Sequence, residues 1–158
     1  MTPVFKRILR RLKGSSTLTF AVYPLVTVAW ELFLNKGRLR VEPLFLPLLA
    51  WGYLQYRLCG LYRIRRGGGG PGMDTPPERL VTTGPFAYTR NPMYLGHLIF
   101  LVGLALTLQS LLAALLAAAT AVRFHFRVAR DERRLTERFG EPYVAYLRKV
   151  KRWVPGLF

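Results

Sequence analysis

Residues that usually hold metals or form covalent bridges are scarce in this chain of 158 residues, which has one cysteine and two histidines. A single cysteine, Cys59, excludes a disulfide within the chain and a cluster of thiolate metal ligands. His125 has no second histidine or acid at a metal-ligand spacing. We therefore expect no metal site, and we interpret Cys59 as a small apolar residue inside a helix.

Acidic residues are also few, at eight against 24 lysines and arginines, which gives a formal net charge of +16. This charge alone would suit a nucleic-acid-binding protein. The basic residues, however, cluster at 6–13, at 57–66 and from 123 onward, at the ends of apolar runs. That placement is typical of proteins that meet anionic lipid headgroups. We expect contact with membrane lipids and none with nucleic acid.

Charged residues are missing from long stretches of the chain. The runs 17–34 and 43–62 hold one charge each, and 92–122 holds none. A bilayer core of roughly 30 Å takes about 20 apolar residues per helix, so each of the first two runs predicts one span. The third run is too long for one straight span, and Ser110 in its polar centre can cap a second helix. The predicted fold is an all-α integral membrane protein with about four transmembrane helices, the last two a hairpin, and cytoplasmic C-terminal helices.

The distribution of positive charge predicts the orientation in the membrane. Four spans place the N-terminus, the 63–91 loop and the C-terminal tail on one side, and these parts carry most of the positive charge. The positive-inside rule makes that side cytoplasmic, although the loop 35–42 on the other side also holds three basic residues. We expect a multi-pass protein of the bacterial inner membrane or an equivalent.

The same pattern predicts one domain with three parts. The first part, 1–62, contains the first two spans and an N-terminal segment that favours an interfacial amphipathic helix around 4–12 over a cleavable signal peptide. A glycine- and proline-rich loop follows at 63–82. The last part, 83–158, holds the residues that could carry chemistry.

One such group lies where the third apolar run begins. Asn91 and Pro92 predict a capped helix N-terminus, and Arg90 directly precedes them. Free N–H groups at a helix N-terminus and a guanidinium together favour an anion, such as a carboxylate or phosphate. A simple capped span with an arginine on lipid phosphate remains the alternative. Three nearby aromatic residues could form a wall for a flat or cationic group: Phe86, Tyr88 and Tyr94.

A second group follows the third apolar run, at 123–135. Arg127 and Asp131 lie four residues apart, so a helix places them on one face as an ion pair. Glu132 lies five residues after Arg127, roughly 140° around the helix. A solvated helix with an internal ion pair explains this pattern without any function. After Phe139-Gly140, which predicts a helix end, 141–152 shows apolar residues at helical spacing.

Together the two groups resemble the membrane methyltransferases of the isoprenylcysteine carboxyl methyltransferase and phospholipid methyltransferase superfamily. The first family motif is a G-P-aromatic turn followed by R-(H/N)-P-x-Y-x-G, and it matches 84–96. The second is E-E-x-x-L, then F-G-x-x-Y-x-x-Y and V-x-R-x-x-P, and it matches 131–155. Two departures are Asp131 in place of the first glutamate and Asn91 where carboxyl methyltransferases often have histidine.

The resemblance implies S-adenosylmethionine bound at the cytoplasmic face and methyl transfer to a lipid-soluble or prenylated acceptor. The acceptor group would be a prenylcysteine-like carboxylate or a phospholipid-like amine. Arg127 and Glu132 are the implied catalytic residues, Arg127 to orient a carboxylate and Glu132 as the base that an amine would need. The implied cofactor-binding residues are Tyr88, Arg90, Asn91, Pro92, Tyr94, Gly96, His97, Glu132, Tyr143 and Tyr146.

Two other interpretations stay open at this point. A reductase related to membrane sterol reductases would bind NADPH in a similar C-terminal region, although this chain is short for that group. A membrane scaffold without enzymatic activity would use its basic faces for anionic lipid. The identity of the acceptor and the oligomeric state do not follow from the sequence.

Overall fold

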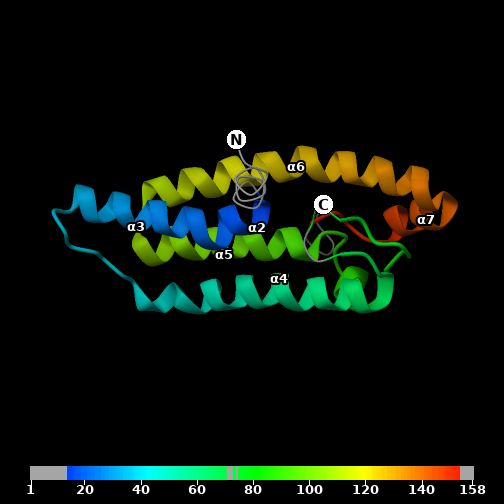
Figure 1. Cartoon of the computed structure of the whole chain (residues 1–158), viewed down its shortest axis with the longest axis horizontal. Coiled ribbons are helices and arrows are strands. Elements are labelled where there is room, and N and C mark those ends of the chain that lie inside the picture. Colours follow the sequence, from blue (N-terminus) through cyan, green and yellow to red (C-terminus); the bar gives the residue numbers. More distant parts are fainter. Residues whose placement is uncertain (1–13, 71–72, 74, 154–158) are drawn as a thin grey trace, which may run out of the picture. The chain divides into compact units, whose positions relative to one another are not determined.

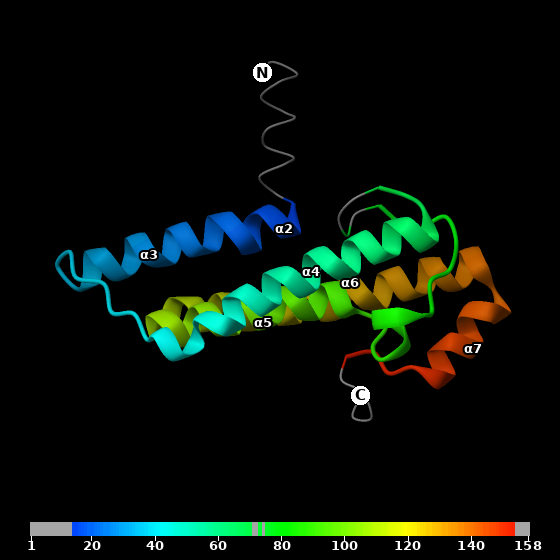
Figure 2. The same cartoon turned by 90° about the horizontal axis from the view of Figure 1, so that it is seen from below.

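The computed structural model describes residues 14–70, 73 and 75–153, and the predicted interfacial helix around 4–12 lies outside them. In this described part all regular elements are helical (Figures 1 and 2). In chain order they are α2 Ser15–Thr17, the π turn η1 Leu18–Val22, α3 Tyr23–Leu34, the 3-10 turn η2 Pro43–Phe45, α4 Leu46–Gly67, the 3-10 turn η3 Gly84–Ala87, α5 Pro92–Leu108, α6 Leu111–Phe139 and α7 Glu141–Lys149.

The first apolar run forms one continuous helical stretch, as the sequence predicts. Elements α2, η1 and α3 follow one another without a break from Ser15 to Leu34. Pro24 has no N–H to donate within the first turn of α3, and the wider π turn η1 directly precedes it. One face of this stretch buries Thr19 and Thr27 completely, whereas Phe33 is 78% exposed. The stretch therefore has a small polar inner face and a large apolar outer face.

The residues group into two compact units, which we describe separately. The first comprises Met1–Tyr53 and His97–Ala118, and the second comprises Leu54–Gly96 and Ala119–Phe158. The division passes through α4, α5 and α6.

The core of the first unit lies between α5 and the start of α6. Its buried members are Leu101, Leu104, Leu108, Ala113 and Ala117, with Tyr23, Val28 and Leu49 packed against them. Gly103 permits a close approach to α4, because a Cβ there would lie 2.8 Å from the Cβ of Leu48. The Oγ of Ser110 accepts the N–H of Ala113 at 3.3 Å. The predicted break between two helices, with Ser110 as the cap, is confirmed.

Two of these helices are long and apolar enough to cross a membrane, judged by length and composition. They are Ser15–Leu34, with 20 residues, and Leu111–Phe139, with 29. Helix α5 is apolar but has 17 residues. Helix α4 is long enough, with 22 residues, but holds Arg57 and three further arginines. The described part is thus all-helical with two candidate spans.

The second unit has a smaller aromatic core around α7. Tyr143, Tyr146 and Val150 are its buried members, with Leu80, Leu135, Phe139 and Leu147 packed against them. Gly140, at φ 61°, separates α6 from α7 in the conformation that glycine tolerates best. The predicted helix end at Phe139-Gly140 and the helical spacing after it are both confirmed.

Candidate active site

A cavity of about 360 Å³ lies entirely within the second unit. Helix α6, helix α7 and the start of α5 contribute to its wall. The end of α4 and the segment before η3 contribute as well. This volume falls in the range of small-molecule sites. The lining residues are Arg63, Met73, Pro76, Pro77, Leu80, Val81, Phe86, Arg90, Asn91, Pro92, Met93, Tyr94, Arg127, Asp131, Arg134, Leu135, Arg138, Tyr143 and Tyr146.

One wall of the cavity is built by a contact between the two motif segments. The hydroxyl of Tyr94, on α5, donates to the Oδ2 of Asp131, on α6, at 2.7 Å. The Nε of Arg127 lies 3.7 Å from the same oxygen, and its guanidinium lies 5.8 Å from the centre of the Tyr94 ring. The predicted pair of Arg127 and Asp131 is confirmed. The buried ring of Phe124 packs edge-on against the ring of Tyr94 and restricts its position.

The cavity is strongly positive. Among the described residues that line it, five are arginines and one, Asp131, is an acid. Arg127, Asp131, Arg134 and Arg138 follow one another along one face of α6, three or four residues apart. A cleft lined by one sign of charge concentrates ligands of the opposite sign. The cavity is therefore suited to a ligand that carries at least one anionic group.

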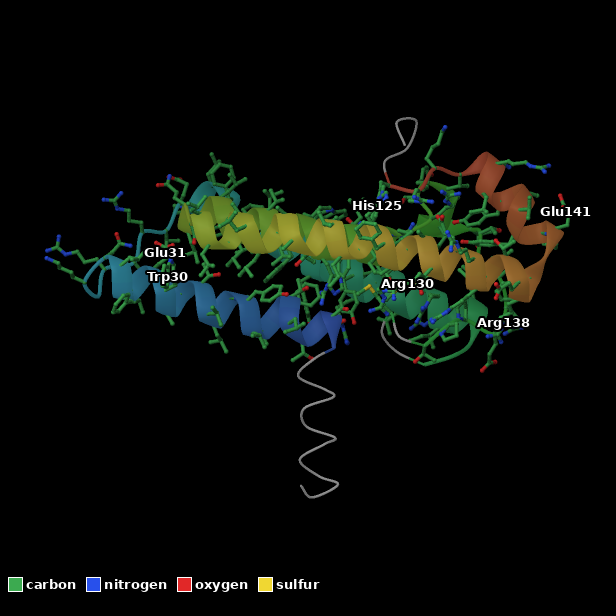
Figure 3. All side chains as sticks on the ribbon, turned by 90° about the horizontal axis from the view of Figure 1, so that it is seen from above. Trp30, Glu31, His125, Arg130, Arg138 and Glu141 are labelled. Atoms are coloured by element: carbon green, nitrogen blue, oxygen red, sulfur yellow. The ribbon has the colours of Figure 1, made fainter. Side chains whose placement is uncertain are left out.

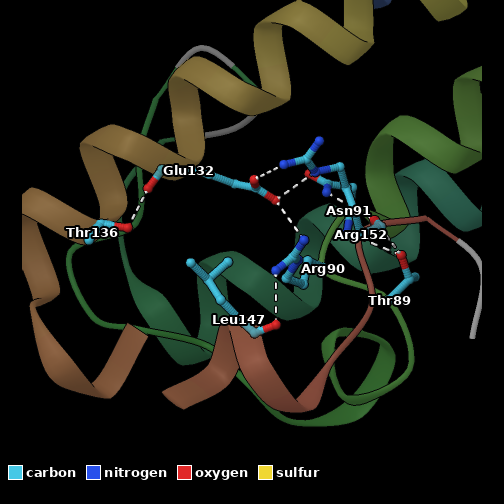
Figure 4. A network of polar contacts seen from close by, with 7 residues as sticks. All are labelled: Thr89, Arg90, Asn91, Glu132, Thr136, Leu147 and Arg152. Carbon is cyan, nitrogen blue, oxygen red and sulfur yellow. Dashed lines mark hydrogen bonds and ion pairs between the residues drawn. The ribbon is translucent and has the colours of Figure 1, made fainter. Parts of the chain in front are cut away.

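Glu132, adjacent to Asp131, makes different contacts (Figure 4). Its Oε1 accepts from the Nη2 of Arg90 and from the Nε of Arg152, both at 3.1 Å, and its Oε2 accepts from the Nη2 of Arg152 at 2.5 Å. Arg90 also donates from Nη1 to the carbonyl oxygen of Leu147 at 3.1 Å. Both carboxylate oxygens of Glu132 are thus engaged by two guanidinium groups.

The segment after α7 is bound to the loop before α5 by several hydrogen bonds. The Oγ1 of Thr89 and the Nδ2 of Asn91 both donate to the carbonyl oxygen of Arg152, at 3.1 and 3.0 Å. The backbone N–H of Arg90 donates to the carbonyl oxygen of Lys151 at 3.0 Å. The start of α5 at Pro92 is as predicted. The Nδ2 of Asn91 binds the C-terminal segment, and the helix cap expected from its side-chain oxygen stays a prediction.

Two tyrosines of α7 form another part of the wall. The hydroxyl of Tyr146 donates to the carbonyl oxygen of Phe86 at 2.6 Å, which ties α7 to η3. Burial, with a smaller contribution from the negative charge of Glu132, raises the pKa of Tyr143 to about 12. Burial also raises the pKa of Tyr146 above its usual value. Both rings therefore stay neutral at physiological pH and present flat surfaces to a ligand.

The structure places seven of the predicted site residues on the cavity and four elsewhere. On the cavity are Arg90, Asn91, Pro92, Tyr94, Arg127, Tyr143 and Tyr146. Tyr88 is 71% exposed, and Glu132 contacts Arg90 and Arg152 without lining the cavity. Gly96 also does not line it, and His97 belongs to the first unit, where its ring centre is 4.6 Å from that of Phe20. The roles predicted for these residues stay predictions.

Sequence reasoning missed the apolar side of the cavity, which the glycine- and proline-rich loop supplies. Met73, Pro76, Pro77, Leu80 and Val81 line it. The N–H groups of Glu78 and Arg79 both donate to the carbonyl oxygen of Gly67 at 2.8 Å and fold the loop back onto α4. A Cβ at Gly67 would lie 2.7 Å from the Cγ2 of Val81, so only glycine fits there. The available signal in the sequence was Gly67, a glycine at the end of an arginine-rich helix, where the loop can fold back onto that helix.

Comparison with known proteins agrees with the motif assignment. Residues 70–141 match the family described as phospholipid methyltransferase. A protein-S-isoprenylcysteine O-methyltransferase of Schizosaccharomyces pombe is 34% identical over 77 residues, 48% of this chain and 33% of that protein. The protein-S-isoprenylcysteine O-methyltransferase B of Arabidopsis thaliana is 36% identical over 79 residues, 49% of this chain and 40% of that protein.

A third relative matches over more of the chain. The methanethiol S-methyltransferase 1 of Bradyrhizobium diazoefficiens is 27% identical over 141 residues, which is 84% of this chain and 47% of that protein. This chain therefore spans less than half the length of each of these three relatives. The superfamily predicted from the two motifs is confirmed.

Proposed function

Because residues 70–141 belong to the phospholipid methyltransferase superfamily, which includes the isoprenylcysteine carboxyl methyltransferases, we propose that this chain transfers a methyl group from S-adenosylmethionine to a lipidic acceptor. One observation carries the proposal. The two motif segments, some 40 residues apart, meet at one cavity, where Tyr94 contacts both Arg127 and Asp131. A cavity shared by both motifs is what a common cofactor and acceptor site requires.

The lining residues fit the parts of S-adenosylmethionine. Its carboxylate suits Arg90, whose Nε–H is buried and has no acceptor among the described residues. Asp131 suits a positive charge, from either the amino group or the sulfonium. The neutral rings of Tyr143 and Tyr146 suit the adenine. When bound, the cofactor supplies a methyl group on a positively charged sulfur, and this chain's residues hold and align it.

We further propose that the acceptor group is an acid, in preference to an amine. The five arginines of the wall would repel a cationic headgroup and attract a carboxylate. A carboxylate is already ionised near neutral pH, so it needs no base. Its oxygen forms a bond to the methyl carbon while the carbon–sulfur bond breaks, and the electron pair of that bond stays on sulfur.

Of the two predicted catalytic residues, we assign a part in this step to one. Arg127, held by Asp131, orients the acceptor carboxylate. Glu132, predicted as a base for an amine acceptor, is engaged with Arg90 and Arg152, and we assign it a structural part in the site. A reaction without proton removal is consistent with this arrangement.

For the membrane we propose the four-span topology, with the cavity and both termini at the cytoplasmic face. The two candidate spans support it, and so do large apolar side chains that are half or more exposed on other helices. Exposed apolar surface of this kind is costly in water and favourable in a bilayer. Examples are Trp51 and Leu58 on α4, each 57% exposed. A lipidic acceptor could then reach the cavity from the bilayer.

A transfer assay with methyl-labelled S-adenosylmethionine tests the proposal. The full chain in lipid nanodiscs is given a farnesylcysteine with a free carboxyl group, its methyl ester, or phosphatidylethanolamine. We expect label in the free acid alone, released as methanol by base. Label in phosphatidylethanolamine would overturn the acid assignment. Absence of transfer, with thermal stabilisation by NADPH, would replace the methyltransferase by a reductase, and stabilisation by neither cofactor would favour a scaffold.

A further inference from the structure

Arg152 is the last but one of the described residues, yet it makes more polar contacts with the loop before α5 than any neighbour in its segment. Its carbonyl oxygen accepts hydrogen bonds from Thr89 and Asn91. Its guanidinium donates two hydrogen bonds to Glu132, from Nε at 3.1 Å and from Nη2 at 2.5 Å. Backbone and side chain of one residue thus bind two different elements.

The contacts of Glu132 extend this connection to the cavity. Arg90 lines the cavity and Arg152 does not. The carboxylate of Glu132 lies between them and accepts from both guanidinium groups (Figure 4). The side chains of Arg90 and Glu132 are each 12% exposed, and that of Arg152 is 30% exposed. Charge-assisted hydrogen bonds of this burial fix the direction of a side chain, because water competes for them only weakly.

The geometry points to Arg152 as a positioning residue that, through Glu132, holds the guanidinium of Arg90 at the cavity wall for an anionic group of the ligand. This inference rests on the proposed function, since the ligand group in question is the carboxylate of S-adenosylmethionine. Glu132 is by the same inference a positioning residue for Arg90 as well. Without the second guanidinium, Glu132 is free to rotate and Arg90 loses the fixed partner of its Nη2.

The connection also explains why the segment after α7 is fastened to the loop before α5 by its backbone. Hydrogen bonds to the carbonyl oxygens of Lys151 and Arg152 set the position of the chain at the base of the Arg152 side chain. A long side chain can position another group well when its own backbone is fixed. Arg148, on the exposed side of α7, lacks this setting: its partner Glu141 lies 3.9 Å away, and both side chains are 76% exposed.

A double-mutant cycle on the full chain, with S-adenosylhomocysteine as the calorimetric probe, tests the inference. We expect Arg152→Gln to weaken binding about tenfold and Arg90→Gln to weaken it at least as much, by the loss of charge-assisted hydrogen bonds. Because Arg152 acts through Arg90, the double variant should bind like Arg90→Gln alone. Arg152→Lys should recover part of the affinity, and the control Arg148→Gln should bind like the unsubstituted chain. Additive losses would overturn the inference.

A second measurement does not need the ligand. Phenylglyoxal modifies accessible arginines, and peptide mass spectrometry follows Arg90 by itself. Arg152→Gln should speed modification of Arg90 several-fold, and Arg148→Gln should not; an unchanged rate in Arg152→Gln would overturn the positioning role. If Arg152→Gln does not fold, Arg152→Lys takes its place in both measurements. It should weaken binding and speed modification of Arg90 in the same direction but by less, and no change in either would overturn the inference. If the unsubstituted chain binds no S-adenosylhomocysteine, the proposed function fails, and the modification rate alone decides the role of Arg152.

Discussion

Two faces of helix α6 carry neighbouring carboxylates with different surroundings. On one face Asp131 lines the cavity with Arg127, Arg134 and Arg138 and accepts the hydroxyl of Tyr94. On the other, the side chain of Glu132 is 12% exposed and lies between Arg90 and Arg152. The difference teaches that two adjacent acids of one motif can have different roles. One faces the cavity, and the other binds the arginines that connect the elements around it.

Removing the charge of Glu132 should have the largest effect on stability. Glu132→Gln leaves two partly buried guanidinium groups without their shared counter-charge, which we expect to cost about 3 kcal/mol of the free energy of unfolding. Thermal unfolding in detergent measures the loss. The control is Glu141→Gln, whose partner is exposed and whose substitution should cost under about 0.5 kcal/mol. Equal melting temperatures for the two variants would show that the network contributes little.

Removing the charge of Asp131 should mainly affect activity. Asp131→Asn keeps an oxygen that can accept the hydroxyl of Tyr94, but it removes the negative charge from the cavity wall. We expect methyl transfer to fall about a hundredfold, with a stability loss under about 1 kcal/mol because the side chain is 32% exposed. Glu137→Gln, on the exposed side of α6, is the matched control. Full activity in Asp131→Asn would remove this residue from the active site.

The helices and half of the cavity residues of α5, α6 and α7 could be predicted from the sequence, because helical spacing and caps are local properties. Arg127 and Asp131 are an example, since a separation of four residues places them together whatever the rest of the chain does. The division between Asp131 and Glu132 could not be predicted. It depends on Arg152 and on the loop before α5, which long-range backbone contacts bring together.

The apolar side of the cavity was unpredictable for a related reason. A glycine- and proline-rich loop has no periodicity that reveals which residues point inward. Pro76 and Leu80 line the cavity because the loop binds the end of α4 through the carbonyl oxygen of Gly67. The same holds for side chains on the helices. His125, Arg130 and Arg138 project from α6 (Figure 3). Arg138 lines the cavity and His125 does not, and the sequence alone does not distinguish them.

A smaller effect is expected from the hydroxyl that joins α5 to Asp131. Tyr94→Phe keeps the ring that packs on Phe124 and lies beside Arg127, but it removes the 2.7 Å hydrogen bond. We expect methyl transfer to fall roughly three- to tenfold, as the net value of one hydrogen bond suggests. Steady-state kinetics with labelled cofactor measure it. A loss as large as that in Asp131→Asn would mean that the hydroxyl, and not the carboxylate, contacts the ligand.

The smallest effect at neutral pH is expected from Tyr143. Its pKa in the folded chain is raised to about 12, above a value of about 10 in the unfolded chain. The neutral ring therefore stabilises the fold fully below pH 10, and this contribution is lost as the pH rises toward 12. Tyr143→Phe should melt like the unsubstituted chain at pH 7 and lose less stability between pH 10 and 12. Parallel alkaline melting curves for the two proteins would contradict the burial of this hydroxyl.

The most direct test of the central claim is to locate the cofactor on the chain. Ultraviolet cross-linking of labelled S-adenosylmethionine, followed by peptide mass spectrometry, identifies the residues that contact it. We predict label on the peptides that carry Tyr94 and 127–135, suppressed by excess S-adenosylhomocysteine and not by NADPH. Absence of label, or label confined to peptides of 14–53 and 97–118, would contradict the assignment of the cavity as a methyltransferase active site.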